Sequence, residues 1–224
     1  MKKLASTLPN MLLSLGLITL LSGALLGLFY SITKEPIDEA ARRQQTEAIA
    51  AVLPTYDNDP EQDMAEVSLH DATYAVYPAL EEGRLVGAAV KGASMDGFGG
   101  EIVVICGFDA DGKVRDYRVL SHAETPGLGS KMEMWFRDPA GARSVLGKSP
   151  AESDFRPSKD GGEIDGITAA TISSRAFLSI LREAYEAYVQ LASSKYGVKL
   201  SKSEWKKTDA DASSGASHHK REQS

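Results

Sequence analysis

The hydrophobic positions of the chain form three patterns in succession: a long apolar run near the N-terminus, an alternating middle segment, and helical spacing in the C-terminal third. The apolar run covers residues 11–32, and no charged residue occurs between Lys3 and Lys34. Because a helix rises about 1.5 Å per residue, roughly 20 such residues cross a bilayer core of about 30 Å. A cleaved signal peptide would have a shorter apolar region of about 7–15 residues. We therefore predict a transmembrane anchor over residues 1–34.

The charged residues on the two sides of this run favour opposite orientations in the membrane. Lys2 and Lys3 precede it and favour a cytoplasmic N-terminus, since basic residues are retained on the cytoplasmic side. Lys34, Arg42 and Arg43 follow the run and weaken that preference. The residues alone therefore leave the topology open.

Residues 35–66 are predicted to form a juxtamembrane helix and a linker. Pro36 suits the first turn of a helix, apolar positions then recur at helical spacing, and Pro54 ends the pattern. Residues 55–66 are acidic and contain Pro60, which is typical of an exposed loop. The segment would act as a spacer between the membrane and the domain that follows.

The middle segment predicts β-strands connected by short turns. The predicted strands cover residues 72–77, 85–90, 101–108 and 113–120. Consecutive strands with short turns form an antiparallel sheet, and helical spacing dominates only from residue 168 onward. The fold class is therefore α+β, with an antiparallel sheet and a long C-terminal helix in a domain over residues 67–200. Residues 201–224 are mostly polar, and we predict a disordered tail.

The composition excludes several classes of function. The chain has 224 residues and a net charge of -6, so it lacks the basic excess of a nucleic-acid-binding protein. Its single cysteine, Cys106, lies in an apolar run and is predicted to be a buried small hydrophobe. One cysteine cannot form an internal disulfide, nor can it hold a cysteine-ligated zinc ion or iron–sulfur cluster within this chain. No metal site is expected.

A hydroxyl-rich stretch over residues 165–174 precedes the C-terminal helical pattern. Asp165 and Thr168 are good capping residues, and the pattern predicts that the helix begins at Thr168. Free backbone N–H groups and the positive end of the helix dipole would then lie beside Thr168 and Thr171, where they favour a phosphate. Caps of this kind are routine, however, so these residues by themselves leave both interpretations open.

Residues 165–171 of this stretch have the sequence Asp165-Gly166-Ile167-Thr168-Ala169-Ala170-Thr171. This sequence resembles the Asp-x-x-Ser/Thr-Gly-Ala-Thr flavinylation motif of the FMN-binding domain family. The resemblance implies that Thr171 carries FMN through a phosphoester bond, which a flavin transferase makes from FAD. It also implies that Asp165, Thr168, Ala169 and Ala170 belong to the cofactor-binding site. Ala169 departs from the motif, because it adds a methyl group where the family usually has glycine.

A second motif is Glu124-Thr125-Pro126-Gly127-Leu128-Gly129. By itself it predicts a Pro-Gly turn that leads into a short helix at residues 131–136. It resembles a loop that helps to shape the flavin site in two related members of the family. These are the G subunit of the Rnf-type electron-transport complex and the C subunit of the sodium-pumping NADH:quinone reductase. Gly127 and Gly129 would let the backbone approach a planar ring, and Leu128 would offer an apolar contact. Glu124 would orient the loop or meet polar atoms of the flavin, with Thr125 beside it.

A glycine cluster at residues 95–100 is expected to form a loop between two strands. It lacks the spacing and the following helix of a dinucleotide-binding fold. It is similar to the Gly-aromatic-small-Gly segment that precedes a strand in the same flavin domain.

Taken together, the resemblance implies a membrane-anchored subunit with covalent FMN that relays electrons from ferredoxin to NAD⁺ within an Rnf-type ion-translocating complex. Its partners would be the other subunits, a flavin transferase and the lipid bilayer, but not nucleic acid. The flavin domain would be extracytoplasmic, in the periplasm at the inner membrane, and the N-terminus cytoplasmic. No catalytic residue is expected in the chain itself, since no nucleophile–His–acid arrangement is visible.

Three alternatives stay open at this point. The chain could be a C-type subunit of the quinone reductase, a flavin-binding sensory or regulatory membrane protein, or a structural assembly subunit. In the last of these, Thr171 would only cap a helix.

Overall fold

A computed structural model describes residues 7–69 and 72–201, which form two compact units that divide between Thr46 and Glu47. The first unit is a single helix, α1, which spans Leu8–Val52 and so continues into the second unit. It contains an 18-residue window with a mean hydropathy of 2.2 and no buried residues, so it is long and apolar enough to cross a membrane. The predicted tail over 201–224 lies outside the described residues, apart from Ser201.

Pro36 lies inside α1, and the expectation that it begins a separate juxtamembrane helix is wrong. A proline in a helix interior removes one backbone hydrogen bond and crowds the preceding turn. In a helix of 45 residues, the many remaining backbone hydrogen bonds keep the chain helical on both sides of Pro36. The apolar run and the juxtamembrane segment therefore belong to one element.

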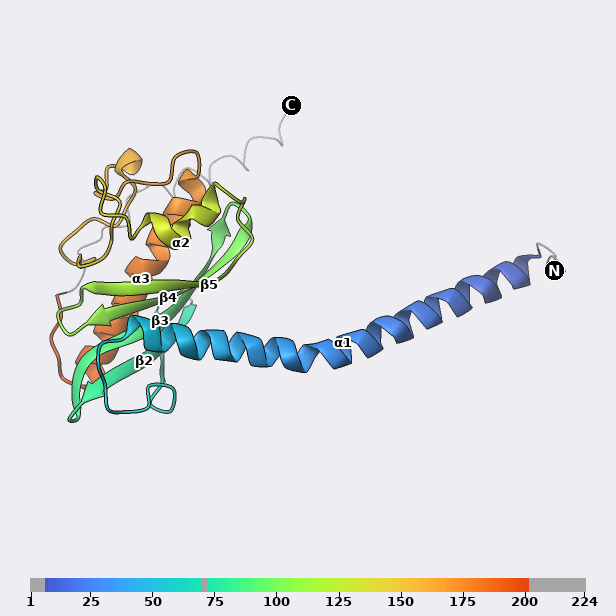
Figure 1. Cartoon of the computed structure of the whole chain (residues 1–224), viewed down its shortest axis with the longest axis horizontal. Coiled ribbons are helices and arrows are strands. Elements are labelled where there is room, and N and C mark those ends of the chain that lie inside the picture. The colour runs from blue at the N-terminus through green and yellow to red at the C-terminus, as the bar shows by residue number, and fades with distance from the viewer. Residues whose placement is uncertain (1–6, 70–71, 202–224) are drawn as a thin grey trace, which may run out of the picture. The chain divides into compact units, whose positions relative to one another are not determined.

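The second unit is built on a five-stranded sheet whose spatial order is the order of the strands along the chain (Figure 1). The strands are β1 Ala65–Leu69, β2 Ala72–Glu81, β3 Arg84–Gly97, β4 Gly100–Asp109 and β5 Val114–His122. Every neighbouring pair is antiparallel, which confirms the predicted α+β class with an antiparallel sheet. Strand β1 was not predicted from the sequence, because it has only one buried residue, Val67, which pairs with Tyr74.

The β3–β4 hairpin differs from the expected loop at residues 95–100. Both strands extend into the glycine cluster, and Gly97 pairs with Gly100 across a turn at Phe98 and Gly99. A Cβ atom on Gly99 would lie 2.0 Å from the carbonyl oxygen of Ala123. The glycine therefore allows the tip of the hairpin to touch the segment that follows β5.

One face of the sheet packs against α3, the long C-terminal helix over Thr171–Lys195 (Figure 1). Aromatic side chains fill this core: Phe177 of α3 stacks on Phe136 with ring centroids 4.6 Å apart and meets Tyr117 of β5 edge-on at 4.9 Å. Cys106 is fully buried here, as predicted, and burial raises the pKa of its thiol. Short helical segments lie in the chain between β5 and α3: η1 Gly129–Lys131, α2 Met132–Trp135 and η2 Ser158–Asp160.

The opposite face of the sheet carries the C-terminal end of α1. Ala48, Ile49, Val52 and Leu53 form a second core with apolar residues of three strands, namely Tyr77, Ala79, Ala89 and Ile105. Gly107 of β4 makes the approach possible, because a Cβ atom there would lie 2.2 Å from the carbonyl oxygen of Val52. Both faces of the sheet are thus covered, and α3 begins at one end of the sheet.

Candidate functional site

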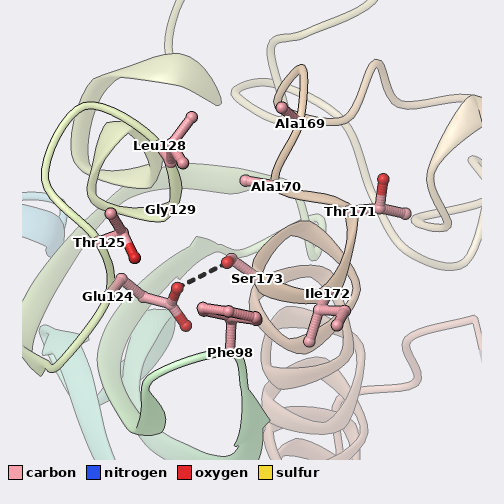
Figure 2. A pocket seen from close by; sticks show the side chains of 10 residues that line it. All are labelled: Phe98, Glu124, Thr125, Leu128, Gly129, Ala169, Ala170, Thr171, Ile172 and Ser173. Carbon is pink, nitrogen blue, oxygen red and sulfur yellow. Dashed lines mark hydrogen bonds between the residues drawn. The ribbon is translucent and has the colours of Figure 1, made fainter.

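A cavity of about 330 Å³ lies at the N-terminal end of α3 (Figure 2). Three segments that are far apart in the sequence line it: the β3–β4 turn, the loop after β5, and the start of α3. The lining residues are Phe98, Glu124, Thr125, Leu128, Gly129, Ala169, Ala170, Thr171, Ile172 and Ser173. Both motifs identified in the sequence therefore meet in one place.

The helix begins three residues later than predicted, at Thr171, and the expected caps are wrong. Ala170 occupies the N-cap position and provides no side-chain hydrogen bond to the helix. Thr168 is exposed, and Ala169 adopts a left-handed backbone with φ of 64°, which breaks any helix at that point. The true start is therefore set by the backbone at residue 169.

Asp165 serves a different part of the structure. One carboxylate oxygen accepts a hydrogen bond from the backbone N–H of Ala142 at 3.0 Å, and the other accepts one from the Ser158 hydroxyl at 2.8 Å. These two hydrogen bonds, in that order, lower the pKa of Asp165. Asp165 therefore ties together the loops that precede α3, and it does not line the cavity.

The absence of a side-chain cap leaves backbone donors at the helix start. Within the described part of the chain, the N–H groups of Thr171, Ile172 and Ser173 have no hydrogen-bond partner, whereas that of Ser174 donates to Ala170. These donors and the positive end of a 25-residue helix dipole suit an anion such as a phosphate.

The hydroxyl groups around this start differ in their availability. Ser174 is buried, donates to the Ala170 carbonyl at 2.9 Å and accepts from the Ile167 N–H at 2.8 Å. Ser173 is also buried and donates to Glu124 at 2.7 Å. Thr171 is half-buried, and its hydroxyl makes no hydrogen bond with any described residue; it points away from the Glu124–Ser173 pair (Figure 2).

Glu124 fixes the wall of the cavity. Its side chain is buried, with only 5% of the residue exposed. One carboxylate oxygen accepts the Ser173 hydroxyl at 2.7 Å, and the other accepts the backbone N–H of Gly99 at 3.2 Å. A single carboxylate thereby joins the loop, α3 and the β3–β4 turn. Of the two roles expected for Glu124, the structure supports orientation of the loop.

The two glycines of the loop have different roles. A Cβ atom on Gly129 would lie 2.3 Å from a carboxylate oxygen of Glu124, so Gly129 permits the close contact of loop and carboxylate. Gly127 lies outside the cavity lining and adopts φ of 76°, which glycine accepts without strain. The Thr125 carbonyl accepts the Leu128 N–H at 3.1 Å and closes this turn. Leu128 remains 39% exposed at the edge of the cavity.

Three lining residues were not predicted as site residues: Phe98, Ile172 and Ser173. Phe98 is the aromatic residue of the glycine cluster, and the other two follow Thr171 directly, so each lies beside a recognised motif. Among the predicted residues, Asp165, Thr168 and Gly127 are outside the lining.

The lining fits a phosphorylated planar ring in its chemistry. Phe98, Leu128 and Ile172 are apolar and 69%, 39% and 48% exposed, and they come from the three different segments. They give the cavity an apolar rim, and the helix start gives it N–H donors at one side. A volume of about 330 Å³ is at the lower end of the roughly 300–1,000 Å³ of small-molecule sites.

Comparison with known proteins places this cavity within a recognised domain. The family described as FMN-binding domain matches residues 97–186, a range that contains every lining residue. The G subunit of the ion-translocating oxidoreductase complex of Aliivibrio fischeri (strain MJ11) is 33% identical over 193 residues, which cover 82% of this chain and 91% of the relative. The proteins of the same name from Stutzerimonas stutzeri and Cereibacter sphaeroides (strain ATCC 17023) are 37% and 36% identical. The first alignment covers 78% of each chain, and the second covers 75% of this chain and 78% of the relative.

Proposed function

Because this chain belongs to the family of G subunits of ion-translocating oxidoreductase complexes, we propose that it carries FMN covalently on Thr171 and relays electrons from ferredoxin to NAD⁺ within an Rnf-type complex. It is a membrane flavoprotein subunit of a redox complex. The observation that carries the proposed attachment is the free hydroxyl of Thr171 at an uncapped helix start beside the cavity.

The attachment is a transfer of FMN from FAD, performed by a separate flavin transferase. The hydroxyl oxygen of Thr171 forms a bond to the FMN phosphorus, the phosphoanhydride bond of FAD breaks, and AMP leaves. The hydroxyl proton passes to the transferase or to water. No histidine or carboxylate within the described part of the chain is hydrogen-bonded to Thr171, and none is needed, since the transferase supplies the catalysis.

The residues of this chain then hold the attached group. The N–H groups at the start of α3 stabilise the remaining phosphate charge by about 0.3–1 kcal/mol. Phe98, Leu128 and Ile172 would provide apolar contacts to the ring, and Glu124 holds the loop, the turn and the helix together through its hydrogen bonds. The bound flavin supplies the electron transfer, while the protein supplies position and electrostatics. A covalent bond also prevents loss of the cofactor outside the cell.

We further propose that the flavin domain is periplasmic and that α1 anchors it in the inner membrane with the N-terminus in the cytoplasm. Lys2 and Lys3 support this orientation. A reporter fused after Ser224 should be active only in the periplasm. Activity in the cytoplasm would overturn the topology.

The family assignment supports this function over the alternatives. The relatives from Aliivibrio, Stutzerimonas and Cereibacter are named as G subunits of an ion-translocating oxidoreductase complex and not as quinone reductase subunits or sensory proteins. A structural subunit in which Thr171 only begins a helix would fold in the same way, so this alternative requires a direct experiment.

The test is in-gel fluorescence of the full chain produced with and without a flavin transferase. We expect a fluorescent band after denaturation only with the transferase, and a peptide containing Thr171 whose mass is raised by FMN minus water. Thr171→Ala should abolish both signals, whereas Ser193→Ala, the control at an exposed hydroxyl of the same helix outside the motif, should retain them. A dark wild-type band, or a fluorescent Thr171→Ala band, would refute the attachment.

A further inference from the structure

A second cavity of about 520 Å³ lies away from the flavin site and shares no residue with it. We call it the arginine groove, because three of its lining residues are arginines. Its lining comprises Ala51, Arg115, Asp116, Arg118, Met134, Arg137 and Leu146. Ala51 belongs to the end of α1, and the other residues come from β5, α2 and the chain that follows α2.

The groove lies on the face of the sheet that carries the end of α1. Arg118 pairs with Ile105 across the β4–β5 ladder, and Ile105 belongs to the core beneath α1. Directly opposed residues of an antiparallel pair project to the same face. The buried residues of that core come from α1, β2, β3 and β4, with none from β5. The end of α1 therefore leaves β5 less covered, and the groove occupies this part of the face.

Asp116 organises two of the arginines. Its carboxylate oxygens lie 2.7 Å from Nε of Arg137 and 3.2 Å from a guanidinium nitrogen of Arg118. Arg137 already has several partners within the fold, since it also donates to the carbonyls of Glu133 and Tyr117 and lies over the Tyr117 ring. Arg137 is thus a structural member of the groove.

Arg115 and Arg118 keep donor capacity for a ligand. Arg115 is exposed and its side chain makes no hydrogen bond or ion pair with any described residue, and Arg118 has a 44% exposed side chain with a single ion pair. Three arginines and one aspartate give the groove an excess of positive charge in a chain whose net charge is -6. An anionic partner fits this groove, and two carboxylates can each engage one guanidinium.

The apolar members of the groove favour a protein segment as the occupant. Met134 is 68% exposed beside the arginines. Arginine and methionine are enriched in protein–protein interfaces, where methionine adapts its shape to the partner. We propose that the arginine groove binds an acidic segment of another subunit of the complex, with carboxylates on Arg115 and Arg118 and an apolar side chain on Met134. This inference depends on membership of the complex but not on the flavin bond.

The first test measures assembly in the intact complex. The full chain is produced in its native host, and the complex is purified through a tag on a different subunit. We expect the variant with Arg115→Glu and Arg118→Glu to be recovered about tenfold less than wild type. The matched control, Arg84→Glu with Lys199→Glu, changes the net charge equally at exposed positions outside the groove and should be recovered normally. Equal recovery of the groove variant and the control variant would refute the proposed binding role of the groove.

Two readouts separate failure of this inference from other failures. In-gel flavin fluorescence of each variant reports whether the domain is folded and modified, and Arg115→Glu alone offers a milder change that leaves the Asp116–Arg118 pair intact. If wild type itself fails to copurify with the tagged subunit, the proposed membership of a complex is at fault. If wild type copurifies and the groove variants do so equally, only the groove is refuted.

The second test identifies the occupant. A photo-crosslinking amino acid replaces Met134 in the full chain within native membranes, and the adduct is analysed by mass spectrometry. We expect a peptide of another subunit that contains at least two acidic residues within a few positions. An adduct with lipid, an adduct with a basic peptide, or no protein adduct would overturn the proposal.

Discussion

The Ser173 hydroxyl donates a hydrogen bond to the Glu124 carboxylate at 2.7 Å, which joins the start of α3 to the loop after β5. The two residues are 49 positions apart in the sequence, and both are buried. The second carboxylate oxygen holds the Gly99 N–H of the β3–β4 turn. The three segments that line the cavity at the start of α3 are therefore connected through one side chain, and the shape of the cavity depends on that connection.

Removing the Ser173 hydroxyl should cost stability. Ser173→Ala leaves one buried oxygen of Glu124 without its donor, and such a loss costs about 1–3 kcal/mol. Ser179→Ala is the matched control, since Ser179 lies on the same helix and donates to Glu183 at 2.9 Å in a half-buried setting. We expect its cost to be below about 1 kcal/mol. Denaturant unfolding of the full chain in detergent provides the comparison, and equal costs for the two variants would contradict the role of Glu124.

A methyl group on Gly129 should disturb the same connection from the loop side. The added Cβ would lie 2.3 Å from a Glu124 oxygen and 2.6 Å from the Ser173 hydroxyl, so both must move. We expect Gly129→Ala to destabilise the fold by about 1–3 kcal/mol and to reduce flavin fluorescence in the gel assay. Gly166→Ala is the control, because its Cβ would meet Ser174 at an ordinary 3.4 Å. Full flavin labelling of Gly129→Ala would show that the carboxylate does not shape the cavity.

Replacing Ala169 by glycine, the residue that the family usually has at this position, should stabilise the fold. Its φ of 64° lies in the left-handed region, which costs a residue with a Cβ atom roughly 1 kcal/mol relative to glycine. Ala169→Gly should therefore raise the free energy of unfolding by up to about 1 kcal/mol. Ala170→Gly, at φ of −135°, should instead lower it by about 0.5–1 kcal/mol, since glycine only adds chain entropy there. The same sign for both variants would argue against strain at residue 169.

Acid should weaken the loops that precede α3. Arg175 lowers the pKa of Asp160 through paired hydrogen bonds, and Arg156 lowers that of Asp154 in the same way. A carboxylate whose pKa is lower in the folded state stabilises the fold above its ordinary pKa of 3.8, and this contribution is lost as the pH falls through the folded value. The free energy of unfolding should therefore decline as the pH is lowered from about 4.

The variant Arg175→Gln tests the cause of this acid dependence. It removes the largest influence on Asp160 and leaves the Asp154–Arg156 pair in place. We expect its unfolding free energy to decline less between pH 5 and about pH 2 than that of wild type, as measured by denaturant titrations at each pH. An identical decline would show that the Asp160–Arg175 pair contributes no acid dependence.

The sequence was sufficient for features that are encoded locally. Alternation and turn residues predicted four of the strands and their antiparallel order. Two short motifs predicted a cofactor site, and seven of their residues line one cavity: Glu124, Thr125, Leu128, Gly129, Ala169, Ala170 and Thr171. The apolar run predicted the membrane helix. In each of these cases, a few neighbouring residues determine the feature, either through spacing or through backbone geometry.

Features that residue type and spacing do not determine were missed or misplaced. The start of α3 was placed at Thr168 from its capping chemistry, but the left-handed backbone of Ala169 moves it to Thr171. Asp165 was interpreted as a cap, although its partners lie in loops that only the tertiary fold brings near. Pro36 predicted a helix boundary, but α1 continues through this position. Spacing along the chain does not carry this information.

The contact between β4 and the end of α1 leads to a final prediction. A Cβ atom on Gly107 would lie 2.2 Å from the Val52 carbonyl oxygen, which is backbone and cannot rotate away. Gly107→Ala should therefore force the last turn of α1 off the sheet and lower the unfolding free energy by about 3 kcal/mol or less. Gly92→Ala is the control, because its Cβ would lie 2.7 Å from Cγ2 of the buried Ile180 and so strains the contact with α3 on the other face of the sheet. Hydrogen exchange over residues 47–53 should accelerate in the first variant and stay unchanged in the second. Unchanged exchange in Gly107→Ala would show that α1 is not held to the sheet through this contact.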